Sequence, residues 1–290
     1  MHTSRVIIFT FSIFLVSGFQ KDKPVYQIYN NNGKAIKYKE VIKEISEADI
    51  VFFGEIHNNP ISHWLQLEIT EDIYQMDSNL ILGFEMFEAD NQLLLDEFLG
   101  GLISEEKFED EARLWDNYKT DYQPLISFAK EKSLKVVASN VPRRYASLVF
   151  NKGLDGLDEL SDVAKTYLPP LPIEFDPELD AYKSMLGMMH SKSEDDSTRY
   201  YFPMAQAIKD ATMAWFIRQN FEKGKKVIHF NGAYHSDNYQ GIIWYLKKYL
   251  PEIDIKTIST QEVEDVKNIE GQDSKADFNI FVVDNITRTY

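Results

Sequence analysis

The chain has 290 residues, of which 44% are hydrophobic and 27% are charged, a composition that is typical of folded globular proteins and excludes disordered and fibrous architectures. Its formal charge of -15 repels the phosphates of nucleic acid, so no nucleic-acid partner is expected. It contains no cysteine, which excludes disulfides and thiolate metal ligands, so any metal site must use His, carboxylate or Tyr side chains.

The N-terminus has the pattern of a secretory signal peptide. Arg5 precedes an apolar run over residues 6–16, which ends at the small residues Ser17 and Gly18. The run is about 11 residues long, whereas a helix needs roughly 20 to span a bilayer. We therefore expect residues 1–19 to be cleaved and residues 20–290 to form a single exported domain in the periplasm. Without a cysteine to acylate, a lipoprotein anchor is excluded.

The elements that follow alternate between apolar, β-rich runs and segments with helical periodicity, in the order that builds a mainly parallel sheet. Strands are predicted at residues 49–53, 80–84, 135–138, 226–230, 254–258 and 278–283. Helices are predicted at residues 61–76, 93–98, 204–221 and 241–249, and residues 105–132 are mostly helical. In the first helix, the apolar side chains at helical spacing are Ile61, Trp64, Leu65, Ile69, Ile73 and Met76.

The alternation breaks between residues 153 and 203, where a proline-rich stretch is followed by a helix-like segment at 179–190. We interpret this region as a helical insertion over the carboxyl ends of the strands. The predicted fold class is therefore α/β, with a mainly parallel β-sheet flanked by helices and carrying this insertion.

Unusual polar residues follow four of the predicted strands. In an open parallel sheet, ligands bind in the crevice beyond the carboxyl ends of the strands. Two of the strand ends carry a G-x-x-H motif, at residues 54–57 and 232–235, whereas a third match at 187–190 lies in a helical region and is discounted. The strand ends converge on one predicted site, which contains Glu55, His57, Glu85, Asn140, Arg143 and His235.

These side chains suit metal-assisted or acid–base chemistry. Imidazole and carboxylate are ligands for a divalent transition metal, and the candidate ligands are His57, His235 and Glu55. A glutamate that is not a ligand could act as a general base, and Arg143 could hold an anion or a developing oxyanion. The candidate catalytic residues are Glu55, Glu85, Arg143 and Asn140. Each residue also has a structural interpretation as a helix cap, a satisfied core residue or a surface ion pair.

The motifs together carry a resemblance to a known family. They are Gly54-Glu55-Ile56-His57, Leu82-Gly83-Phe84-Glu85-Met86-Phe87, Asn140-Val141-Pro142-Arg143 and Asn231-Gly232-Ala233-Tyr234-His235. In this order and over roughly residues 45 to 260, the chain resembles the ChaN-like haem-uptake family of the wider Tiki superfamily. The resemblance implies an α/β core with a helical insertion, export, and haem binding linked to iron acquisition. The superfamily also includes proteins that resemble metal-dependent hydrolases.

Two functions remain open on the sequence, and we favour haem binding. Haem needs an apolar surface and an axial His, Tyr or Met, and the candidates are Tyr234, Tyr182, His190 and Met189. Such a stripe of aromatic and Met residues could equally be the core of the insertion. Haem held between two subunits would couple a homodimer to the ligand.

The alternative is a metal-dependent hydrolase, a peptidase or esterase acting on a small-molecule or peptide substrate through the paired G-x-x-H motifs. A serine hydrolase is disfavoured because no G-x-S-x-G motif follows a strand. A structural protein without a ligand is the third interpretation.

Overall fold

The structure is a computed structural model that describes residues 22–188 and 197–290. The predicted signal peptide at residues 1–19 and the candidates Met189 and His190 lie outside the described residues. In the described part of the chain, no helix is both long enough and apolar enough to cross a membrane.

The strands of the described residues form one sheet, which is parallel except at one edge. Their order is β2-β1-β8-β7-β3-β6-β4-β5, with β1 antiparallel to both β2 and β8 and the other neighbours parallel. The strands are β1 (Tyr26–Asn30), β2 (Ala35–Ile36), β3 (Ile50–Glu55), β4 (Leu80–Glu88), β5 (Lys135–Asn140), β6 (Lys226–Gly232), β7 (Ile255–Val263) and β8 (Phe278–Val283). The predicted α/β class with a mainly parallel sheet is confirmed.

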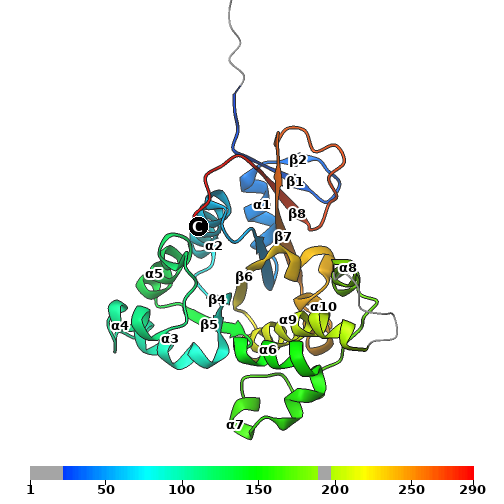
Figure 1. Cartoon of the computed structure of the whole chain (residues 1–290). Helices are drawn as coiled ribbons and strands as arrows, with labels where there is room; N and C mark the ends of the chain where they lie inside the picture. Colours follow the sequence, from blue (N-terminus) through cyan, green and yellow to red (C-terminus); the bar gives the residue numbers. More distant parts are fainter. Residues whose placement is uncertain (1–21, 189–196) are drawn as a thin grey trace, which may run out of the picture.

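Helices cover both faces of the sheet (Figure 1). One apolar core joins the sheet to α1 (Tyr38–Ile45), α2 (Pro60–Met76), α3 (Gln92–Leu99), α4 (Glu105–Glu111) and α5 (Gln123–Lys132). A second core joins the opposite face to α8 (Asp180–Met188), α9 (Tyr201–Asn220) and α10 (Ile242–Tyr249). A smaller core packs α6 (Arg143–Lys152) and the segment containing α7 (Asp162–Lys165) against α9. Because both faces are covered, the central strands are continuously apolar rather than alternating.

The two G-x-x-H motifs lie side by side because β3 pairs with β6. In the register of these strands, Gly54 is opposite Asn231 and Glu55 is opposite Gly232. The loops after the two strands pack closely: a Cβ atom on Gly54 would come within 2.8 Å of the Ala233 Cα. Only a residue without a side chain permits this approach at position 54.

The predicted strands and helices are all present, with differences at their ends. Strand β4 continues to Glu88, so Glu85 lies within the strand rather than beyond it. The helix α2 buries Leu65, Ile69 and Ile73 of its predicted face. Trp64 and Met76 are instead 45% and 58% exposed, and the polar side chains His63 and Gln66 are buried in their place. These polar side chains face the sheet because their partners are polar groups of the site described below. The elements β1, β2, α1 and α6 were not predicted from the sequence.

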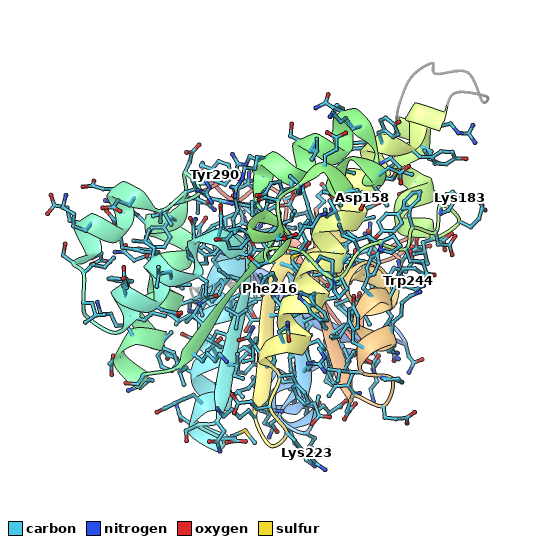
Figure 2. The ribbon with its side chains drawn as sticks, turned by 90° about the horizontal axis from the view of Figure 1, so that it is seen from below. Asp158, Lys183, Phe216, Lys223, Trp244 and Tyr290 are labelled. Carbon is cyan, nitrogen blue, oxygen red and sulfur yellow. The ribbon has the colours of Figure 1, made fainter. Side chains whose placement is uncertain are left out.

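The described parts of the segment at 153–203, residues 153–188 and 197–203, lie toward the carboxyl ends of the strands. In Figure 2, Lys223, which precedes β6, lies at the opposite end of the molecule from Asp158 and from Lys183 of α8. Met185 of α8 lines the cavity at that end of the sheet. This segment therefore supplies part of the wall of the site.

Candidate functional site

A cavity of about 620 Å³ opens at the carboxyl ends of the central strands. It brings together most of the residues that the sequence predicts for the site, namely Glu55, His57, Glu85, Asn140, Arg143, Tyr234 and His235. Its apolar lining includes Ile56, Trp115, Val141, Ala146 and Met185. The convergence of four strand ends on one site is therefore present in the structure, as expected for an open parallel sheet.

The first motif holds a buried carboxylate against a half-exposed imidazole. Glu55 Oε1 accepts a hydrogen bond from the Tyr122 hydroxyl at 2.6 Å and lies 2.8 Å from His57 Nδ1, and the Gln66 amide donates to Glu55 Oε2. Burial raises the pKa of Glu55, but His63, His57 and Tyr122 outweigh it and leave the pKa below its usual value. Glu55 is therefore an ionised acceptor that fixes the ring of His57 through Nδ1.

The loop that carries His57 is fixed by two other segments. The carbonyl oxygen of His57 accepts hydrogen bonds from Asn117 Nδ2 at 2.7 Å and from His63 Nε2 at 3.0 Å. The Trp115 ring packs edge-on against the imidazole, with ring centroids 4.8 Å apart. Burial lowers the pKa of His57, but the neighbouring Glu55 and Glu85 raise it above its usual value. The imidazole side chain is 33% exposed, so a ligand in the cavity can reach it.

The second motif holds a fully bonded, buried imidazole. His235 Nε2 lies 3.1 Å from Glu85 Oε1, and His235 Nδ1 lies 2.5 Å from Asp210 Oδ1. Glu85 Oε2 also accepts a hydrogen bond from the Gly232 backbone N–H at 2.8 Å. Burial lowers the pKa of His235, but the two carboxylates outweigh it and raise the pKa to about 10. His235 is therefore an imidazolium that donates from both ring nitrogens.

This hydrogen bonding involves the predicted metal ligands. A metal needs an imidazole lone pair, and both nitrogens of His235 donate to carboxylates instead. In residues 22–188 and 197–290, no group of three or more His, Asp or Glu side chains is arranged to hold a metal ion. His57 and His235 are each paired with a carboxylate in the structure, and the set of His57, His235 and Glu55 as metal ligands stays a prediction.

The rim of the cavity carries Asn140 and Arg143, at the end of β5 and the start of α6. Asn140 Oδ1 is buried and has no hydrogen-bond partner among the described residues. The Arg143 side chain is 80% exposed, and its Nε is 3.9 Å from Glu88 Oε1. The next residue, Arg144, is instead bonded to Asp90 at 2.5 Å and does not line the cavity.

The two predicted tyrosines have different positions. Tyr234 lines the cavity, and its hydroxyl lies 3.1 Å from Ser184 Oγ of α8. Tyr182 is fully buried in the core between α8 and α9 and donates a hydrogen bond to Asp210 Oδ2 at 2.7 Å. The structure therefore gives Tyr182 a supporting role behind His235 and does not place it on the ligand surface.

Several residues of the site were not predicted from the sequence. They are the hydrogen-bond partners and the further lining residues His63, Gln66, Trp115, Tyr122, Gln206, Lys209 and Asp210. Most lie within helices, where a buried polar residue and a solvent-facing one have the same local pattern. The polar positions of α2 were a usable signal, because they fall on the side of the helix that contains Leu65 and Ile69.

Comparison with solved structures places the fold beside one described as cofacial haem binding to ChaN of Campylobacter jejuni. The two share 18% sequence identity with a TM-score of 0.67, over 89% of this chain and 96% of that one. An erythromycin esterase, EreC, is more distant, with 11% identity and a TM-score of 0.46 over 82% of this chain and 77% of that one. The first of these likenesses supports the fold.

Comparison with curated proteins finds a plant relative, the chloroplastic protein RETICULATA-RELATED 5 of Arabidopsis thaliana. It is 27% identical over 139 residues, which are 46% of this chain and 19% of the plant protein, so the chain matches a small part of that relative. The family described as haem-binding uptake, Tiki superfamily, ChaN matches residues 41–246, which include every residue named above for the cavity. The chain therefore belongs to the ChaN family of haem-binding uptake proteins in the Tiki superfamily.

Proposed function

We propose that this protein binds haem in the cavity at the strand ends and serves haem or iron uptake after export. The observation that carries the proposal is that the family match spans all the residues of this cavity. The volume of about 620 Å³ lies in the usual range for small-molecule and cofactor sites. Trp115, Val141 and Met185 supply apolar surface for a flat, apolar ligand.

The hydrogen bonds favour two side chains as the axial ligand. His57 is bonded to Glu55 through Nδ1, which leaves Nε2 to coordinate iron, in the arrangement that a carboxylate usually enforces on a ligating imidazole. Tyr234 lines the same cavity, and among the described residues its hydroxyl is hydrogen-bonded to Ser184 alone. His235 is disfavoured because both of its ring nitrogens are donors.

A haemin titration of the purified full-length chain, followed by visible absorbance, tests this proposal. We expect a saturable, shifted Soret band at defined stoichiometry. In either His57→Ala or Tyr234→Phe, the Soret band should change in wavelength or fall in intensity. Tyr182→Phe is the matched control, because this tyrosine lies outside the cavity. A non-saturating response of the unsubstituted protein would contradict the proposal. Light scattering with and without haemin tests whether haem joins two copies.

Export through residues 1–19 is part of the same proposal. It rests on the charged start and short apolar run of this segment. Fractionation of expressing cells and N-terminal sequencing of the product test it. An uncleaved chain in the cytoplasmic fraction would contradict export.

A hydrolase is the second candidate, because the cavity contains two carboxylate–imidazole pairs, Glu55–His57 and Glu85–His235. Such pairs are used in general acid–base catalysis. Hydrolysis of ester or peptide substrates that is abolished by His57→Ala would support this function, and its sensitivity to chelators would show whether a divalent metal takes part. Absence of turnover over a broad substrate panel would contradict it.

A further inference from the structure

The acidic side chains of the cavity all have partners within the protein. Glu55 is bonded to His57, Gln66 and Tyr122, and Glu85 is bonded to His235 and to the Gly232 backbone. Glu88 accepts a hydrogen bond from Arg113 Nε at 3.0 Å. Their negative charges are therefore balanced by fixed donors.

Two cations at the cavity lack comparable partners. Lys209 of α9 lines the cavity and makes no hydrogen bond or ion pair with any described residue. Arg143 of α6 lines it too, and its contact with Glu88 is a long one of 3.9 Å. The two residues come from helices that pack against each other through the core shared by α6 and α9 (Figure 1).

We propose that Arg143 and Lys209 bind the carboxylate groups of the ligand, so that haem enters with its propionates toward these two residues. This inference rests on the proposed haem-binding function. The chain has a formal charge of -15, so an anionic ligand is repelled by most of the surface and needs local cations where it binds. The backbone at the start of α6 adds partial positive charge, because Pro142 supplies no side-chain cap there.

This arrangement gives the cavity two chemically distinct parts. The apolar lining, with Ile56, Trp115 and Met185, contacts the hydrocarbon body of the ligand. The cations contact its charged edge, and Arg143 can do so with two parallel N–H donors. An amphiphilic dicarboxylate thus binds in one orientation, which sets the face of the macrocycle presented to His57 and Tyr234.

The test compares haemin with its dimethyl ester, in which both propionates are neutral. Arg143→Gln and Lys209→Gln should each raise the dissociation constant of haemin by about 10-fold. This factor corresponds to the lower end of the free energies measured for hydrogen bonds to charged groups. Neither should change the affinity for the ester, which should bind the unsubstituted protein more weakly than haemin does. Arg144→Gln and Arg218→Gln are the matched controls, because each removes a positive charge from α6 or α9 outside the cavity.

Two contrary results have different meanings. If the unsubstituted protein binds haemin and the ester equally, and both cavity variants bind as it does, the inference is overturned while haem binding stands. If the unsubstituted protein binds neither, the proposed function is overturned, and the inference with it. The variant Lys209→Arg keeps the charge and should retain haemin binding within about threefold, which separates loss of charge from damage to the fold. Arg143→Lys keeps the charge but loses the paired N–H donors, so it should bind haemin more weakly than the unsubstituted protein and more tightly than Arg143→Gln.

Discussion

The Nε2 atom of His57 lies directly over Gly232, the first residue of the second motif. A Cβ atom at position 232 would come within 2.7 Å of this nitrogen, which is closer than side-chain atoms tolerate. The two G-x-x-H motifs therefore pack directly against each other. Gly232 of the second motif has no side chain, which leaves room for the imidazole of His57 of the first motif. The glycine is required by this close approach, since its backbone is not in the left-handed region.

Gly232→Ala should displace the imidazole of His57 and weaken ligand binding. Overpacking of this kind typically costs about 1–3 kcal/mol of stability. We expect a lower free energy of unfolding in urea and a weaker, shifted haemin spectrum. Gly100→Ala at the end of α3 is the control for losing a glycine, because its φ is -72° and the nearest atom to a Cβ atom there is the Asp96 carbonyl oxygen at 3.1 Å. An unchanged spectrum in Gly232→Ala would show that the imidazole is not a ligand.

His229, buried beneath the site, should make the protein less stable in acid. It is bonded to Asn231 at 3.0 Å and to Ser139 at 2.9 Å, and burial lowers its pKa from 6.5 to about 4. Between these values the unfolded chain binds a proton that the folded protein does not, so the free energy of unfolding falls as the pH drops from about 6.5 toward 4.

Urea denaturation at pH 7, 5 and 4 measures this loss, which should be on the order of 3 kcal/mol. The acid slope should be smaller in His229→Gln, which keeps a polar side chain of similar length. If the two proteins lose stability in parallel, protonation of His229 is not the cause.

His235 should give the opposite dependence above neutral pH. Its pKa is raised from 6.5 to about 10 by Glu85 and Asp210, so its contribution is fully present below about 6.5 and is lost as the pH rises toward 10. Deprotonation removes one of the two donors of His235, so that either Glu85 or Asp210 loses its hydrogen bond to the imidazole and keeps only its bond to Gly232 or Tyr182. We expect a decline on the order of a few kcal/mol between pH 7 and 9.5, measured by urea denaturation.

The comparison variant is His235→Gln, which is already less stable at pH 7 but should change little with rising pH. An equal decline in both proteins would argue that other groups, such as lysines, dominate the alkaline range.

The two tyrosines of the predicted haem surface should respond differently to removal of their hydroxyls. Tyr182→Phe loses the hydrogen bond to buried Asp210 and should lower the free energy of unfolding by about 1–3 kcal/mol without changing haemin affinity. Tyr234→Phe should leave stability nearly unchanged and alter the haemin spectrum. The reverse pattern would return Tyr182 to the ligand surface.

Most of the strands, and the motifs at their ends, could be predicted from the sequence. Buried parallel strands have a continuous apolar pattern, so β3, β4 and β6 were predictable. Glu55 and His57 were predictable as site residues because they are polar and come where the apolar run of β3 ends. The antiparallel edge was not predicted, because β1 (Tyr26–Asn30) is a mixed polar and aromatic segment that is only partly buried.

The support of the site could not be predicted for a different reason. Asp210 lies in a helix that is apolar on several sides, and nothing in its local pattern distinguishes a polar residue that faces the sheet from one that faces solvent. Gln66 lies on the same side of α2 as Leu65 and Ile69, which indicates burial but not the group that it bonds to. Their burial is stabilised by partners distant in the chain, His235 and Glu55. The same effect accounts for Trp64 of α2, which the apolar spacing predicts to be buried and which is 45% exposed.

The position of β3 between β6 and β7 has a consequence for synthesis of the chain. Both neighbours come from the C-terminal third, beginning at Lys226 and Ile255, so β3 leaves the ribosome long before either edge can pair. The pairing of β3 with β6 and β7 closes long loops, which is slow. Until these strands have been made, β3 is an apolar strand with two unpaired edges. Nascent chains that stop short of Lys226 should aggregate or require a chaperone, and the first G-x-x-H motif is without its partner until the second has been made.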